Sequence, residues 1–285
     1  MERPATRAKR FLALALAALP LGFLAPSSSR ADAAAKLAGR ASAGRREPRM
    51  EARRAMYTPY PVPVAVGAGV VAAIIQALVS AVAEPIVNRV LVMRVRIIQA
   101  IKEVRPSFVL RFLKTTLITN FLELPLFEAV YAVLSGLPAL SAPLQGCLSG
   151  LVFTTATLPI MNLRYRKSMQ LEVQLGNIYE AYVPTVLRDM LYGTVRRYVT
   201  GALISAGFIG TSPEVLLLAV ILARAASAPL NEWRGYQLQT KAKRLTLEEF
   251  FRLENFLRSL LVGMVQGLAL SVGYSYAPAI ATQLR

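Results

Sequence analysis

Six apolar stretches, separated by polar connections, occupy most of the chain after its first 60 residues. They cover about 62–82, 108–134, 143–158, 181–209, 213–228 and 256–277. A helix needs about 20 apolar residues to cross roughly 30 Å of hydrocarbon, so this pattern predicts six transmembrane helices. The third and fifth stretches are short, and each can cross only if its helix continues through the proline that follows.

The connections between these stretches alternate in charge. Those after the first, third and fifth stretches are basic, whereas 135–142 and 200–212 contain no charged residue. Six consecutive crossings would place every basic connection on one side of the membrane. The positive-inside rule assigns that side to the matrix or stroma of an organelle, with both termini opposite.

The composition favours a membrane protein and excludes several kinds of chemistry. Of the 285 residues, 55% are apolar and 17% are charged, against roughly 25% charged in soluble domains. There is no histidine and a single cysteine, which excludes Ser-His and Cys-His catalytic pairs and thiolate metal cages. We expect no enzyme activity, cofactor or metal site. Of the net charge of +17, the first 56 residues carry +8, and the bases of the remainder alternate with the apolar stretches, so we expect no nucleic-acid partner.

The first 56 residues resemble a targeting leader. A basic start and an apolar core at 11–19 form a signal-peptide pattern, and an Ala/Ser/Arg-rich segment follows up to Arg54. This order resembles the bipartite leaders of plastid proteins in algae with secondary plastids, and a plain mitochondrial presequence is the alternative. We expect residues 1–56 to be removed and residues 57–285 to form the domain, in an organelle inner membrane of a plastid rather than a mitochondrion.

A repeat runs through the membrane domain. Pro85, Pro159 and Pro229 close the odd-numbered stretches at intervals of 70 to 74 residues, and Arg188 and Arg258 each lie 29 residues after the proline of their repeat. We expect three helical hairpins with pseudo-threefold symmetry about a central axis, because one hairpin alone could not bury its polar groups. Their approximate ranges are 62–135, 143–209 and 213–280.

Two of these prolines begin motifs that resemble the signature of the mitochondrial carrier family. Pro159-Ile-Met-Asn-Leu-Arg164 and Pro229-Leu-Asn-Glu-Trp-Arg234 match its proline and base. The resemblance covers about 64–276 and implies an all-α membrane protein with six transmembrane helices in three repeats. It also implies a structural signature consisting of Pro85, Pro159, Pro229, Arg164 and Arg234.

The signature also departs from the family. The acid expected two residues after each proline is replaced by Val87, Met161 and Asn231. In the family these acids and bases form a charge network that closes the matrix side of the cavity. Without the acids we expect unpaired cations there, a costly arrangement unless water or lipid headgroups solvate them. The chain is therefore interpreted as a divergent member.

Charged residues at membrane depth are candidates for function, because a charge at a helix centre costs ~2.5–3.5 kcal/mol to insert. Arg188, Asp189, Arg258 and Glu123 occupy equivalent positions in the even-numbered helices, so a threefold arrangement would direct them into one cavity. The resemblance implies that they contact the substrate: the arginines would hold a carboxylate, and Asp189 an ammonium group. Alternatively, these charges pair with one another and only fix the helix register.

Two further patterns have simpler interpretations. Arg224 lies five residues before Pro229, and we expect its head to extend towards the basic face; the alternative is that it points inward. Gly146-x-x-x-Gly150 and Gly263-x-x-x-Gly267 predict close contacts between helices.

Two functions fit these observations. The first is exchange of a small anionic or zwitterionic metabolite by alternating access. The second, suggested by the missing signature acids, is a transport-inactive scaffold or adaptor subunit of a larger membrane complex. Both place the protein among membrane lipids.

We expect a tagged full-length chain to localise to plastids and to lose about residues 1–56 on import, because that segment has the leader composition. Microscopy with N-terminal sequencing of the purified protein checks both points. Localisation to mitochondria would favour the presequence alternative.

Overall fold

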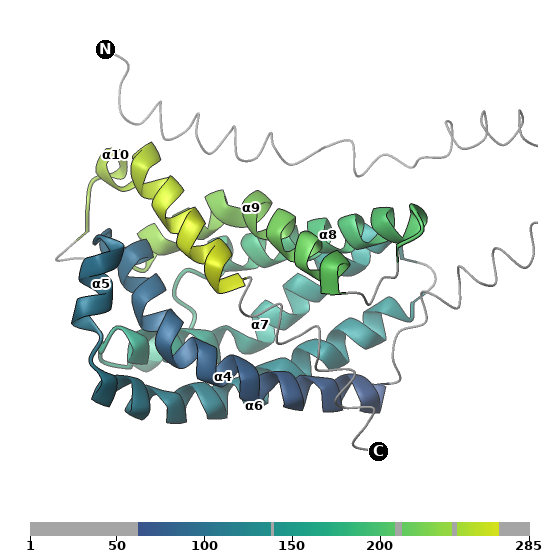
Figure 1. Ribbon diagram of the computed structural model, residues 1–285, viewed down its shortest axis with the longest axis horizontal. Coiled ribbons are helices and arrows are strands. Elements are labelled where there is room, and N and C mark those ends of the chain that lie inside the picture. The colour runs from purple at the N-terminus through teal and green to yellow at the C-terminus, as the bar shows by residue number, and fades with distance from the viewer. Residues whose placement is uncertain (1–61, 138–139, 209–212, 241–243, 268–285) are drawn as a thin grey trace, which may run out of the picture.

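The computed structural model describes residues 62–137, 140–208, 213–240 and 244–267. Within these ranges the chain is helical and contains no strand (Figure 1), as the sequence predicts. The predicted leader and the end of the sixth apolar stretch lie outside the described residues.

Each of the six apolar stretches forms a long helix. These helices are α4 (Val62–Met93), α6 (Pro106–Ser135), α7 (Ala142–Ser168), α8 (Tyr182–Ser205), α9 (Pro213–Gln237) and an unlabelled helix described over 253–267, yellow in Figure 1. The basic connections contain the short helices α5 (Ile97–Glu103), η2 (Leu175–Asn177) and α10 (Leu247–Phe250). The order long helix, short helix, long helix therefore occurs three times along the described chain.

The odd-numbered stretches continue through their prolines. Pro85, Pro159 and Pro229 lie inside α4, α7 and α9. Helices α7 and α9 therefore reach 27 and 25 residues, which meets the condition that the short third and fifth stretches had to satisfy for crossing a membrane.

Three of the described helices are long and apolar enough to cross a membrane by length and composition. They are Ala65–Met93, Pro106–Leu134 and Ala142–Ser168. The other three long helices carry more charge; α8, for example, contains Arg188, Asp189, Arg196 and Arg197. The described chain is thus consistent with a membrane protein, and crossing by all six helices stays a prediction.

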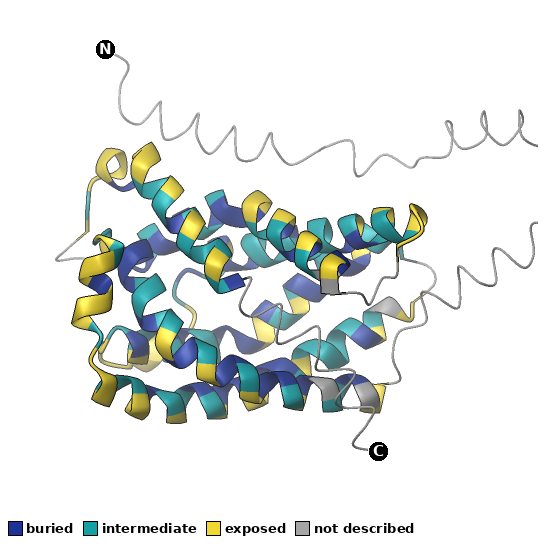
Figure 2. Cartoon of the chain, viewed as in Figure 1, coloured by how far each residue is buried: buried dark blue, intermediate teal, exposed yellow. Residues whose placement is uncertain are grey.

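Apolar side chains are exposed on the long helices, while many polar ones are buried. On α4 the exposed residues Val70, Ile74, Leu78 and Val82 recur every four positions, so they share one helix face. Figure 2 shows exposed and buried positions alternating along each long helix. Fully buried polar side chains include Thr116, Thr154, Thr157 and Thr185. An apolar exterior around a polar interior suits contact with lipid acyl chains.

Glycines bring α7 and α8 into close contact. A Cβ atom added at Gly146 would lie 2.1 Å from the carbonyl oxygen of Gly193, and one at Gly150 would lie 2.3 Å from that of Asp189. The predicted contact at this glycine pair is confirmed. In the second pair only Gly267 makes such a contact: a Cβ there would lie 2.3 Å from the Arg224 side chain of α9, whereas one at Gly263 would meet no described residue outside its own helix turn within 4 Å.

The C-terminal ends of α4, α7 and α9 meet at the end of the bundle that carries the basic connections. The Tyr165 hydroxyl donates to the carbonyl of Leu238 (3.1 Å), and the Gln239 side chain donates to that of Val92 (2.7 Å). Arg89 donates to the carbonyl of Ser168, at 3.2 Å. These contacts join all three odd-numbered helices at the basic end.

Gly146→Ala should force α7 and α8 apart, because the new methyl group would overlap the Gly193 backbone. We expect a lower unfolding temperature in detergent and a loss of about 1–3 kcal/mol. Gly263→Ala is the matched control, since it makes the same change inside a helix where the new methyl group would lie more than 4 Å from every described residue of the other helices. It should preserve stability or raise it slightly. Equal unfolding temperatures for the two variants would contradict the close contact.

Candidate functional site

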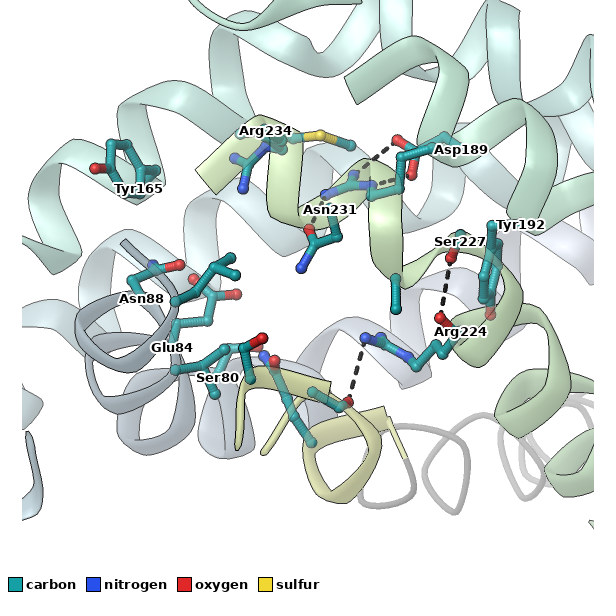
Figure 3. Close-up of a pocket in the computed structure, with 18 of the residues that line it drawn as sticks. Ser80, Glu84, Asn88, Tyr165, Asp189, Tyr192, Arg224, Ser227, Asn231 and Arg234 are labelled. Atoms are coloured by element: carbon teal, nitrogen blue, oxygen red, sulfur yellow. Dashed lines mark hydrogen bonds and ion pairs between the residues drawn. The ribbon is translucent and has the colours of Figure 1, made fainter. Parts of the chain in front are cut away.

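A cavity of about 340 Å³ lies between the long helices (Figure 3). Its lining includes residues of α4, α6, α7, α8, α9 and the helix over 253–267. This volume is in the range of small-molecule sites. All six long helices thus contribute to one cavity wall.

Arg164 on α7 forms the most extensive charge contact of this wall. Its guanidinium lies 3.0 Å from Glu84 on α4 and 2.6 Å from Glu123 on α6, and it donates to Asn120 at 2.9 Å. Glu123 is 3% exposed. A buried cation needs such partners because desolvation is costly. The expectation of unpaired signature cations is therefore wrong for Arg164, because Glu84 supplies a carboxylate from the position before Pro85.

Arg188 and Asp189, both predicted site residues, also line the cavity and pair with each other. Two contacts join them, at 2.7 and 2.9 Å. Asp189 also accepts a hydrogen bond from Thr154 (2.6 Å), and Arg188 donates to Asn231 (3.3 Å). This pairing was the alternative left open by the sequence. Glu123 lies in the same cavity wall, with Arg164 as its partner.

Arg258 is not among the residues that line the cavity. It pairs with Glu254, one turn earlier on its own helix, at 2.5 Å. The neighbouring Ser259 lines the cavity instead. Successive residues are separated by about 100° around a helix, so a rotation by one position exchanges the two side chains. The expectation that Arg258 faces the cavity is corrected.

Arg224 on α9 points into the bundle, the alternative to extension towards the basic face. Its side chain lines the cavity, where Figure 3 shows it. One nitrogen makes a weak contact with the carbonyl of Gly263 (3.5 Å), and the buried Nε has no hydrogen-bond partner among the described residues. The missing side chain of Gly267 leaves room for it, since a Cβ there would lie 2.3 Å from Nε.

Arg234, the signature base of the third repeat, lines the same cavity. It is 8% exposed, and its guanidinium lies 5.9 Å from the centre of the Tyr165 ring. Its Nε is buried without a hydrogen-bond partner in the described part of the chain. For Arg234 no substitute carboxylate replaces the missing signature acid in the way that Glu84 does for Arg164.

No model of a known protein family matches this chain, and no curated protein matches it. The likeness to mitochondrial carriers therefore rests on the prolines, the bases and their spacing alone.

A second buried ion pair was missed by the sequence interpretation. Arg94, with a left-handed φ of 57°, pairs with Glu232 on α9 and lies 3.6 Å from the centre of the Phe250 ring. Ser259 donates to the same carboxylate. Burial lowers the pKa of the Arg94 guanidinium, and the carboxylate of Glu232 opposes that shift. Both Glu84 and Glu232 lie within three residues of a helix proline, and this was the signal available for finding them.

Arg164→Met should be strongly destabilising, because it leaves the carboxylates of Glu84 and Glu123 buried without a cation. We expect a loss of about 3–5 kcal/mol in the free energy of unfolding, measured in detergent. Combining it with Glu84→Gln and Glu123→Gln should recover part of that loss.

Arg166→Met on the same helix is the control. Its partner Glu180 is 29% exposed, so we expect a loss below about 1 kcal/mol. A similar loss for both single variants, or no recovery in the triple variant, would contradict the central role of Arg164.

Proposed function

We propose that the chain is a six-helix organelle membrane protein, similar to mitochondrial carriers, that exchanges a small anionic or zwitterionic solute by alternating access. The observation that carries this proposal is the charged cavity to which all six long helices contribute. A protein with no role in binding solutes would gain little from cations at this depth, because each is costly to desolvate.

The charges of α8 and α9 are compatible with membrane crossing under this proposal. Arg188 and Asp189, as well as Arg224, line the cavity and are not directed outwards. Leu218 and Leu222 are exposed on α9. A helix with charges towards a polar cavity and apolar residues towards lipid can span a bilayer although its mean hydropathy is low. In this proposal the three repeats surround the cavity with pseudo-threefold symmetry.

The contacts at the basic end would act as a gate. Tyr165 and Gln239 join the odd-numbered helices by single hydrogen bonds to carbonyl groups, and Arg94 joins the chain after α4 to α9. Access from that side requires these contacts to separate, while the cavity stays between the repeats. Alternating access of this kind needs two packings of similar free energy.

The leader composition alone supports the plastid assignment.

Transport can be tested with the full chain purified and reconstituted into liposomes that are loaded with carboxylates, amino acids, phosphate or nucleotides. We expect exchange of at least one anionic or zwitterionic solute. Arg188→Gln should slow it about tenfold or more, because a charge-assisted hydrogen bond contributes about 1.5–3 kcal/mol.

Arg111→Gln is the matched control, since Arg111 is exposed on α6 and does not line the cavity. It should exchange solute at the normal rate. Folded protein that exchanges none of these solutes would reject the carrier proposal in favour of the scaffold alternative.

A further inference from the structure

Helix α9 directs a row of polar residues into the cavity. Arg224, Ser227, Asn231 and Arg234 all line it and are spaced by three, four and three positions, so they lie along one helix face. At 1.5 Å of rise per residue, the Cα atoms of the two arginines are about 15 Å apart. Figure 3 shows Ser227 and Asn231 on α9 with both arginines at the cavity. The row therefore has a cationic group at each end and neutral hydrogen-bonding groups between.

The two arginines have no carboxylate partner of their own. Neither forms an ion pair with any described residue, and the Nε atom of each is buried without a hydrogen bond. Arg234 is 8% exposed. Buried guanidinium groups in this condition carry a desolvation cost that the Gly263 carbonyl beside Arg224 and the Tyr165 ring beside Arg234 offset only in part.

The charges of the cavity wall do not balance. Arg164 faces two carboxylates, Glu84 and Glu123, so this cluster carries one negative charge, and Glu232 is paired with Arg94, which lies outside the wall. Arg196 interacts electrostatically with Glu128. The cations still to be balanced are Arg188, Arg224 and Arg234, and they share the single carboxylate of Asp189.

The positive charge of Arg188 on α8 affects the arginines at both ends of this row. It acts on both Arg224 and Arg234, in each case as a repelling charge. Because Arg164 faces two carboxylates, the excess over the whole wall and its partners is one positive charge. Around this row, where three guanidinium groups share one carboxylate, the local excess is two. A bound ligand with two negative charges would neutralise that excess and supply the missing acceptors.

We propose that Arg224 and Arg234 form a binding site for a solute with two negative charges, such as a linear dicarboxylate, aligned along α9. One anionic group binds at Arg224, and the other lies towards Arg234 and Arg188. Ser227 and Asn231 offer hydrogen bonds between them. This inference rests on the proposed transport function and deepens it by specifying the solute class, and it adds residues of α9 to Arg188 of α8.

Binding can be measured on the full-length protein in detergent by calorimetry and by thermal unfolding with succinate, glutarate, inorganic phosphate, acetate or glycine. We expect the two dicarboxylates to raise the unfolding temperature more than acetate or glycine does, because a ligand stabilises the state that binds it. Arg224→Gln and Arg234→Gln should each weaken dicarboxylate binding about tenfold or more. Arg111→Gln should bind normally.

The unliganded variants separate a binding role from a structural one. Arg224→Gln without ligand should be as stable as the wild type or more stable, because it removes an uncompensated buried charge. Arg224→Lys keeps the charge but loses the planar fork, so its affinity should lie between those of the wild type and Arg224→Gln. Dicarboxylate binding unchanged in both Arg224 variants would overturn the site, as would a preference for acetate or glycine over the dicarboxylates.

Two further results distinguish this site from the proposed transport and from a lipid ligand. Dicarboxylate binding without exchange in liposomes would reject transport and keep the site. Exchange unaffected by Arg224→Gln would reject the site and keep transport. Stabilisation by phosphatidic acid, with none by the dicarboxylates or inorganic phosphate, would overturn a soluble solute in favour of a lipid headgroup.

Discussion

The arrangement of the helices depends on how buried arginines are compensated inside a bundle whose exterior is largely apolar. Arg164 meets Glu84 and Glu123, which belong to two other helices, so one guanidinium fixes the relative positions of α4, α6 and α7. Arg94 connects the chain after α4 to α9 in the same way through Glu232. Exposed apolar residues on the long helices offer no such partners. Compensation must therefore come from the interior, either from a carboxylate on a neighbouring helix or from something bound in the cavity.

Close packing elsewhere places the remaining charges. Helices α7 and α8 approach so closely at Gly146 and Gly193 that no side chain fits between them. This contact brings the Asp189 backbone against Gly150, and the Asp189 side chain accepts a hydrogen bond from Thr154 on α7. Asp189 in turn pairs with its neighbour Arg188 at the cavity wall. Small residues outside the cavity thus determine which charged residues reach it, because side-chain direction follows from the rotation of the helix.

The sequence predicted the helices, because apolar length and spacing are properties of each segment alone, and it set continuation through the prolines as the condition for the short stretches to cross. It predicted the glycine contact at Gly146 for the same reason. It could not predict that Ser259 and not Arg258 lines the cavity, since the two differ by about 100° of rotation, and packing against other helices sets that rotation. The direction of Arg224 depends in the same way on space beside Gly267, a residue of another helix. Glu84 was overlooked because its partner is 80 positions away in sequence.

The missing signature acids carry less weight once the contacts at the basic end are considered. There the odd-numbered helices meet through Tyr165 and Gln239, which donate to backbone carbonyls. Hydrogen bonds of this kind contribute about 0.5–1.5 kcal/mol each, whereas breaking a buried ion pair costs about 3–5 kcal/mol. A closure made of such bonds together with the Arg94–Glu232 pair holds the helix ends together without an acid two residues after each proline. Loss of those acids is therefore compatible with a working gate and does not by itself favour a scaffold.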